Sequence, residues 1–122
     1  MQKFSIRAVS TGYKFDLKAS NGLIIATSEV YETRAACRKG IESVRKNALK
    51  AKLEDQTVQN FQVATNPKFQ LYEDKSGQYR FRLKSRNGQT IAISESYTTK
   101  AACENGIESI RKNAPEAEVE EA

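Results

Sequence analysis

The sequence predicts an α+β fold in which two tandem β-β-β-α-β repeats share one mainly antiparallel sheet, with the two helices on one face. Three observations predict it: an internal duplication, period-two alternation of apolar residues, and a helical motif that occurs twice. The 122 residues suffice for one compact domain with a single core. A four-stranded half of roughly 55 residues would be marginal alone, which favours one shared sheet.

The duplication becomes visible when the chain is shifted by 66 residues, which aligns 13–54 with 79–120 without a gap. About 25 of the 42 aligned pairs are identical. Before Tyr13 the offset is 65, because Gln78 is an extra residue beside the first turn of the second copy. We therefore predict a first repeat at 1–55, a linker at 56–67 and a second repeat at 68–122, together one pseudo-twofold domain. The linker has no counterpart, and its apolar residues indicate a short strand at 58–63.

Each copy begins with alternating apolar residues. KFSIRAV and YKFDLKAS in the first copy, and KFQLYE and YRFRLKSR in the second, place aromatic and aliphatic side chains on one inward face of a sheet. The dipeptides Asn21-Gly22 and Asn87-Gly88 then predict type I′ hairpin turns, in which both residues take positive φ angles. LIIATS and QTIAIS are the predicted third strands.

The helical motif is AACRKGIESVRKNA at 35–48 and AACENGIESIRKNA at 101–114. Thr33 and Thr99 are predicted N-caps, because a hydroxyl there can accept a hydrogen bond from an unpaired amide of the first turn. One apolar stripe of each helix is expected to pack on the sheet, and it holds Cys37, Gly40, Cys103 and Gly106. Asn47 and Asn113 are expected to end the helices in the left-handed conformation. A last short strand follows, AKLE or AEVE.

Composition limits the chemistry. The chain has a net charge of +5 and contains no histidine, which removes histidine-based triads and the commonest zinc ligand. Glycines are not clustered into a phosphate-binding loop. We expect the two cysteines to be small buried residues in a reducing compartment. No apolar run approaches the roughly 18 residues that span a bilayer. The sequence favours a cytoplasmic, non-enzymatic protein with no metal, no cofactor and no membrane partner.

Two glutamates allow an alternative. Glu29 and Glu95 lie at matching sites, each two residues before a tyrosine, Tyr31 or Tyr97. If the symmetry brings them together, they would form an acid/base pair in an enzymatic or small-molecule site near the pseudo-twofold axis. The structural interpretation is that each anchors a helix start, where the helix dipole favours a negative charge, or pairs with the repeated arginine, Arg45 or Arg111, at the edge of the buried stripe.

The main candidate for binding is a basic sheet face. Alternation places cations opposite the aromatic side, with a single tyrosine among them; these residues are Lys14, Lys18, Tyr72, Arg80, Arg82, Lys84 and Arg86. Such a face can bind nucleic acid or another anionic macromolecule. Charged side chains also keep antiparallel sheets soluble, and Asp16 interrupts the row in the first copy. A purely structural or oligomerising module is the third hypothesis.

The stretch KFQLYEDKSGQYRFRLKSRNGQTIAISESYTTKAACENGIESIRKNAPEAEV resembles the YegP-like family of small, mostly bacterial, uncharacterised proteins. Its repeats carry YRFRLKxxNG, then SExY, then CxNGIxSVxxNAP. Both copies match, although the first has Leu49 for Pro115 and Arg38-Lys39 for Glu104-Asn105. The resemblance implies one sheet with C-terminal strands exchanged between repeats, so that 51–54 pairs in the other half. In the family the two units come from tandem repeats or from two subunits, and no activity is established. For this chain we expect a monomer with internal pseudo-dimer symmetry.

Overall fold

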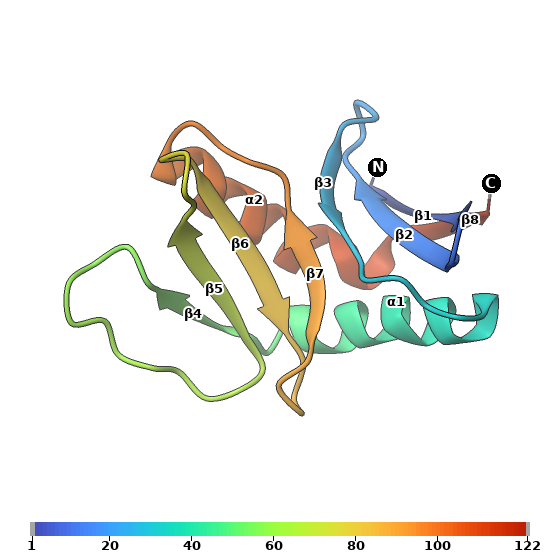
Figure 1. The fold of residues 1–122 in the computed structure, drawn as a ribbon, viewed down its shortest axis with the longest axis horizontal. Helices are drawn as coiled ribbons and strands as arrows, with labels where there is room; N and C mark the ends of the chain where they lie inside the picture. The colour runs from blue at the N-terminus through green and yellow to red at the C-terminus, as the bar shows by residue number, and fades with distance from the viewer. Residues whose placement is uncertain (1, 122) are drawn as a thin grey trace.

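The computed structural model describes residues 2–121, which form eight β-strands and two α-helices. In chain order they are β1 (Lys3–Val9), β2 (Gly12–Lys18), β3 (Ile24–Thr27), α1 (Arg34–Ala48), β4 (Lys52–Asp55), β5 (Lys68–Glu73), β6 (Tyr79–Lys84), β7 (Thr90–Ser94), α2 (Lys100–Asn113), the 3-10 turn η1 (Ala114–Glu116) and β8 (Glu118–Glu121). This is the predicted β-β-β-α-β order, twice (Figure 1). Neither helix is long and apolar enough to cross a membrane.

All the strands belong to one sheet, in the order β4-β5-β6-β7-β3-β2-β1-β8. At its centre β3 and β7 pair antiparallel, with Ala26 opposite Ser94 and Thr27 opposite Ile93. At the two edges β4 runs parallel to β5, and β8 runs parallel to β1. Because β4 follows α1 but pairs in the second half, and β8 follows α2 but pairs in the first, the C-terminal strands are exchanged as the resemblance implies.

The exchanged strand β8 is held at both ends by α1. Arg45 donates a hydrogen bond to the carbonyl of Ala117, just before the strand, and Arg34 pairs with Glu121 at its far end at 2.6 Å. These contacts tie the last strand of the second repeat to the helix of the first.

The strand β4 is held by α2 in the equivalent way. Arg111 donates to the carbonyl of Ala51 at 2.5 Å, and Lys100 pairs with Asp55 at 2.6 Å. Arg45 and Arg111 therefore reach the chain of the other repeat.

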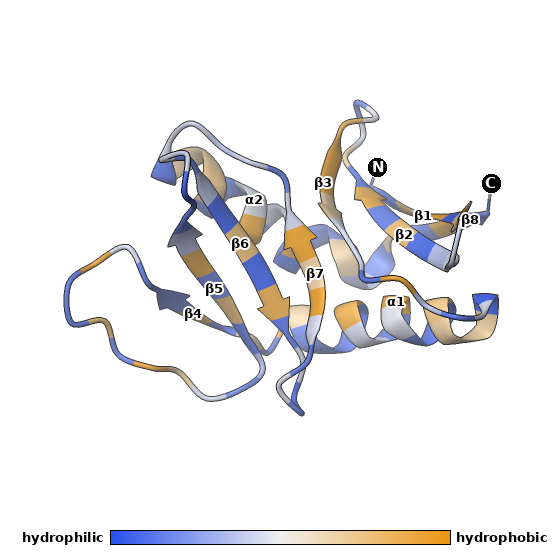
Figure 2. Cartoon of the chain, viewed as in Figure 1, coloured by the Kyte–Doolittle hydropathy of each residue, from blue (hydrophilic) through white to orange (hydrophobic). Residues whose placement is uncertain are grey.

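The core lies between the helices and one face of the sheet. Figure 2 shows the apolar and polar positions that alternate along strands such as β6. Phe4 and Phe15 pack edge to face with ring centroids 5.7 Å apart, and Phe69 and Phe81 do the same at 5.8 Å. The predicted helix stripe is buried, including both cysteines and the helix glycines. The alternation in the strands therefore identified the inward face correctly.

The Asn-Gly turns differ from the predicted type. Gly22 and Gly88 have φ angles of +86°, but neither asparagine has a positive φ. In the first turn Ala19 N donates to Leu23 O and Gly22 N donates to Ala19 O, which is the pattern of a three-residue hairpin loop ending in a left-handed glycine. The type I′ prediction is wrong because the loop has one more residue than that turn allows.

The helix starts are as predicted, but the ends are not. Thr33 and Thr99 accept hydrogen bonds from Ala36 N and Ala102 N at 3.0 and 3.1 Å. Asn47 stays helical and donates its side-chain amide to Ser43 O at 2.7 Å, and Asn113 bonds Ser109 O in the same way. The left-handed conformation expected of both is not adopted, because each amide bonds the preceding helical turn instead.

The segment between β4 and β5 is a loop, and the strand expected at 58–63 does not form. The loop leaves β4, swings out and returns to the start of β5 (Figure 1). Near its end Ala64 N donates to a Glu54 carboxylate oxygen at 2.9 Å, and Ala64 O accepts from Lys68 Nζ at 3.0 Å. Ala64 thus bonds side chains of the sheet, whereas the two ends of the loop bond the sheet backbone. Gln56 N donates to Leu71 O, and Pro67 O accepts from Lys52 N.

Candidate anion-binding surfaces

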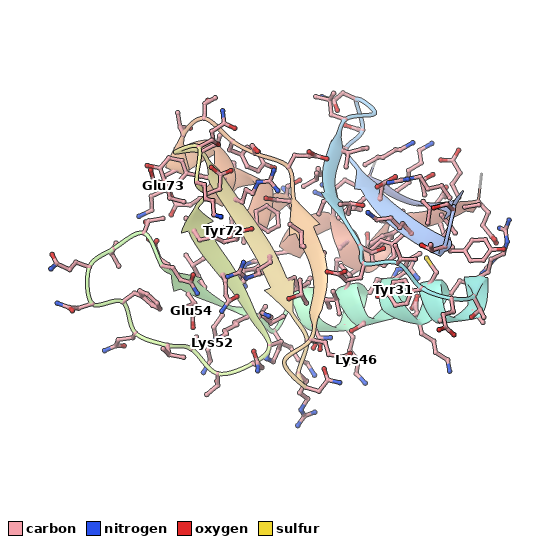
Figure 3. The ribbon with its side chains drawn as sticks, in the orientation of Figure 1. Tyr31, Lys46, Lys52, Glu54, Tyr72 and Glu73 are labelled. Carbon is pink, nitrogen blue, oxygen red and sulfur yellow. The ribbon has the colours of Figure 1, made fainter. Side chains whose placement is uncertain are left out.

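The outer face of the sheet, opposite the helices, collects most of the predicted basic residues. The β5–β6 register sets Tyr72 opposite Arg80, and Lys68 opposite Lys84. Arg82 lies between these pairs, opposite Gln70. The strands therefore bring four predicted residues, Tyr72, Arg80, Arg82 and Lys84, onto one patch, which we call the second-half outer face; Figure 3 marks Tyr72 on it.

Arg82 and Tyr72 form the centre of that patch. The guanidinium carbon of Arg82 lies 4.2 Å from the centroid of the Tyr72 ring, and Arg82 Nε donates to Gln70 Oε1 at 2.6 Å. A cation over an aromatic face is attracted by the ring's electron density. Because Gln70 is neutral, the positive charge of Arg82 is held in place without being cancelled.

Other cations of the second-half outer face are neutralised within the chain. Arg80 pairs with Asp74 at 3.2 Å, and Lys68 pairs with Glu54 at 2.7 Å. The Glu54 side chain is only 2% exposed. Burial alone would raise its pKa, but hydrogen bonds from Lys68, Gln56, Ala64 and Gln70 outweigh burial and lower the pKa to about 2. This pair is buried structure, not a free basic surface.

The first half of the outer face is less basic. Lys14 and Lys18 flank Asp16 on β2, as the alternation predicts, and Asp16 pairs with Arg7 at 2.8 Å. Glu120 of β8 lies 3.5 Å from Lys3. Among residues 2–121, Lys14 and Lys18 form no ion pair, so they are the free cations of β2.

Arg86 does not lie on the sheet face with the others. It belongs to the β6–β7 turn and lines a cavity of about 530 Å³ between that turn and α1. Lys39 and Lys46 line the same cavity from the helix, and Figure 3 places Lys46 beside the turn. A second cavity of about 280 Å³, which also contains Lys50, shares Lys46 and Arg86 with the first. We call this combined surface the α1 groove.

The α1 groove was missed by sequence reasoning because its cations come from segments about forty residues apart. A signal was nevertheless present. Lys39, Lys50 and Arg86 stand where the other repeat has Asn105, Glu116 and Ser20, although most neighbouring positions are identical.

The proposed acid/base pair does not form. In the β3–β7 ladder Glu95 N donates to Ile25 O at 3.3 Å, so Glu95 lies opposite Ile25. Glu29 is four residues further along, which separates the two by roughly 13 Å at the rise of a β-strand. Both glutamates are exposed, and the tyrosines beside them pack against helix glycines, with the pKa of Tyr31 and of Tyr97 raised mainly by burial.

The expected pairing of these glutamates with the repeated arginines is also wrong. Within residues 2–121, Arg45 pairs with Glu42 at 2.5 Å and Arg111 with Glu108 at 3.2 Å, each one helical turn away. The arginines lie on the helix side toward the exchanged strand, where Arg45 also donates to the carbonyl of Ala117 and Arg111 to that of Ala51.

The cysteines lack the features of nucleophiles. Cys37 and Cys103 are buried free thiols, and burial raises the pKa of both, that of Cys103 to about 12. A reactive cysteine needs a lowered pKa and access to solvent. Over residues 2–121, no three carboxylate or thiol side chains gather closely enough to hold a metal ion.

Comparison with known proteins gives a consistent result. The sequence matches the family described as a domain of unknown function (DUF1508) twice, over residues 8–55 and 74–121. A UPF0339 protein of Photorhabdus laumondii is 43% identical over 107 residues, which cover 88% of this chain and 81% of that protein. A UPF0339 protein of Treponema denticola is 59% identical over 54 residues, which cover 44% of this chain but 93% of that protein, so that match spans about one repeat.

A solved structure has the same fold. The solution NMR structure of yegP from E. coli, a protein of unknown function, has a TM-score of 0.79 and 30% identity, covering 98% of this chain and 91% of that one. A UPF0339 protein of Shewanella oneidensis gives the same TM-score and identity.

Proposed function

The chain belongs to the DUF1508 family of uncharacterised proteins, and we propose that it is a non-enzymatic module that binds single-stranded nucleic acid on the second-half outer face. Proteins that hold single strands without sequence preference combine cations along the backbone with aromatic rings on which bases stack. The proposal places the chain in the cytoplasm as a monomer, in keeping with its two free thiols.

The observation that carries the proposal is the Arg82–Tyr72 pair. The guanidinium lies 4.2 Å from the ring centroid on a face where Lys84 forms no ion pair among residues 2–121. A base stacking on the tyrosine or on the guanidinium plane would place its phosphates near Lys84, whereas Arg80 is already paired with Asp74. The corresponding positions of the other repeat are Arg7, Lys14, Asp16 and Lys18, which offer neither an aromatic ring nor an uninterrupted row of cations.

The test is fluorescence anisotropy with a labelled single-stranded oligonucleotide of mixed sequence, titrated at several salt concentrations. We expect binding at low salt that weakens as salt rises, because each phosphate contact releases counterions. Arg82→Ala and Tyr72→Ala should each weaken binding by roughly tenfold, consistent with about 1 to 3 kcal/mol per stacked base.

Lys75→Ala is the matched control. It removes one positive charge, as Arg82→Ala does, but from an exposed lysine in the β5–β6 turn. It should change binding less than twofold. No anisotropy change at low salt, or equal losses in the Lys75 and Arg82 variants, would contradict the proposal.

A further inference from the structure

We propose that the α1 groove is a second binding site, for a small molecule that carries two phosphate groups on a polyhydroxyl body. The groove lies between α1 and the β6–β7 turn, away from the Arg82–Tyr72 pair. Its two adjoining cavities of about 530 and 280 Å³ fall together within the size range of ordinary ligand pockets.

The groove carries a large excess of positive charge. Four cations line it: Lys39, Lys46, Lys50 and Arg86. None of the four forms an ion pair within residues 2–121. The one acid in the lining, Glu42, is already paired with Arg45 at 2.5 Å. The cations are thus available to an external anion.

The other repeat provides an internal comparison. At the equivalent positions the cations Lys39, Lys50 and Arg86 are replaced by Asn105, Glu116 and Ser20, and only Lys46 is kept, as Lys112. The surrounding framework is the same: Ser43, Asn47 and Asn87 recur as Ser109, Asn113 and Asn21. The same framework therefore carries four cations at these positions in one half of the molecule and one cation in the other.

At the equivalent place in the other repeat, a side chain covers the helix. The side-chain amide of Gln2 bonds Ser109 through both the hydroxyl and the backbone carbonyl, the latter at 3.3 Å. The residue equivalent to Gln2 is Pro67, which has no side-chain donor and instead lines the smaller cavity of the α1 groove. The α1 groove is therefore open at the point where its counterpart is occupied by the chain.

The lining selects the class of ligand. A single carboxylate would leave most of the four cations without a counter-charge, whereas two phosphates carry enough charge for all of them. The fork of Arg86 matches phosphate oxygens, and lysines bind phosphate as mobile point charges. The remaining lining offers the Gln89 amide, the Asn87 amide nitrogen and the Asn47 amide oxygen, because Asn47 Nδ2 already donates to Ser43 and Asn87 Oδ1 already accepts from Ser85. It contains no aromatic ring among the described residues. Amides suit hydroxyl groups, and a nucleobase would find no stacking surface.

The test uses the intact chain and NMR titration of side-chain amide signals with fructose 1,6-bisphosphate as the probe. We expect saturable shifts of the Asn47, Asn87 and Gln89 amides, and no comparable shifts of Asn21 and Asn113 in the counterpart groove. Pyrophosphate, which lacks the polyhydroxyl body, should bind at least roughly fivefold more weakly. Because the probe is small and the signals come from the groove, the result is independent of nucleic-acid binding by the outer face.

The decisive variant gives the groove the composition of its counterpart: Lys39→Asn, Lys50→Glu and Arg86→Ser together. All three side chains are exposed, so the melting temperature should hardly change. Binding of the bisphosphate should fall by at least roughly tenfold. The control variant lowers the net charge by the same amount at positions outside the groove: Lys112→Asn, Lys75→Glu and Lys14→Ser together. Its affinity for the bisphosphate should stay within about threefold of wild type.

Three results would overturn the proposal: no saturable shift, equal shifts in both grooves, or equal losses in the two triple variants. Pyrophosphate binding as tightly as the bisphosphate would overturn the polyhydroxyl part of it.

Discussion

Glu54 and Glu120 occupy equivalent positions in the two repeats, and each faces a lysine across a parallel strand pair. The Glu54–Lys68 pair is 2.7 Å long, with the side chains 2% and 11% exposed, whereas the Glu120–Lys3 pair is 3.5 Å long and about half exposed. The difference comes from the loop before β5, which contacts Glu54 and Lys68 and has no counterpart in the other half. The same glutamate–lysine pair is therefore buried in the second half of the sheet and lies on the surface in the first half.

Glu54 should make the protein sensitive to acid. Its pKa is lowered from 4.5 to about 2 in the folded protein, so its stabilising effect is complete above pH 4.5 and is lost as the pH falls toward 2. A shift of this size corresponds to about 3 kcal/mol. Glu54→Gln sets an amide against buried donors and should lower the free energy of unfolding at pH 7 by roughly 3 kcal/mol. Urea denaturation from pH 7 to pH 2.5 measures both effects.

Glu120→Gln is the matched control, because it changes the same atoms at the equivalent exposed pair. It should cost less than about 0.5 kcal/mol. The difference in stability between Glu54→Gln and wild type should also shrink as the pH falls below 4.5. Equal effects of the two variants, or a difference independent of pH, would show that burial of the Glu54 pair has no energetic role.

Gly40 should not tolerate a methyl group. In an open helix Gly→Ala stabilises by about 1 kcal/mol, but a Cβ on Gly40 would lie 2.6 Å from Tyr31 Cζ and 3.1 Å from Phe15 Cε2. We expect Gly40→Ala to lower the free energy of unfolding by roughly 1 to 3 kcal/mol. In a Tyr31→Ala background the same change should be neutral or stabilising. A double-mutant cycle by thermal denaturation measures the coupling, and additive effects would rule out the contact as the cause.

The exchanged strands depend on one arginine from each helix. Arg45 bonds the Ala117 carbonyl before β8 and lies 5.6 Å from the Phe4 ring centroid of β1, the strand that β8 joins. Arg45→Ala should lower the free energy of unfolding by roughly 1 to 2 kcal/mol and speed hydrogen exchange in β8 more than in β4. NMR-detected hydrogen exchange measures it.

Glu42→Gln is the control for that variant, because it removes the partner of Arg45 on the helix surface and leaves the Ala117 contact in place. Because the Glu42 side chain is 62% exposed, the change should lower the free energy of unfolding by less than about 0.5 kcal/mol. The rate of hydrogen exchange in β8 should stay the same. If both variants speed exchange equally, the ion pair rather than the strand contact is what matters.

The elements of the fold could be predicted from sequence because their signals are local. Alternation sets which face of β6 is buried, and Thr33 caps its helix through a contact three residues away. The predictions that failed concern the partner of a polar group. Arg45 was expected to bind Glu29 nearby in sequence, but its acceptor is a carbonyl 72 residues away in the other repeat. No local pattern encodes such a partner.

In the candidate site, too, the local sequence pattern predicts which side chains share a face but not which partners they bind. Tyr72, Arg80, Arg82 and Lys84 share a face because they alternate on two adjacent strands, and this could be predicted. Which of them keeps a free charge could not, since Asp74 in a turn neutralises Arg80 whereas the neutral Gln70 holds Arg82. The α1 groove joins a helix of one repeat to a turn of the other. It exists only because the helix lies across the junction of the halves.

The whole molecule behaves as a dimer of repeats within one chain. Residues 68–122 alone contain a strand, β8, whose partner β1 is absent. Two copies could satisfy each other by pairing β8 with β5, as β4 does in the intact chain. We expect this fragment to be unfolded at low concentration and to fold as a homodimer at high concentration, as for obligate dimers. Sedimentation equilibrium and circular dichroism across a dilution series measure it.

Removing 117–122 from that fragment is the control, because it deletes the strand to be exchanged and should abolish both association and folding. A fragment that folds as a monomer at all concentrations would show that exchange is not needed. The Treponema denticola relative consists of little more than one such repeat, because 93% of its length matches 44% of this chain.

The pairing of β1 with β8 also affects how the protein is made. Within this sheet β1 is synthesised before every other strand, and β8, which completes its edge, is synthesised after every other strand. At about 5 to 20 residues per second, that edge waits on the order of ten seconds. The wait of β4 for β5 is much shorter, because only one loop separates them. Until synthesis reaches β8, the edge of β1 that does not face β2 stays unpaired and open to other growing chains and to chaperones.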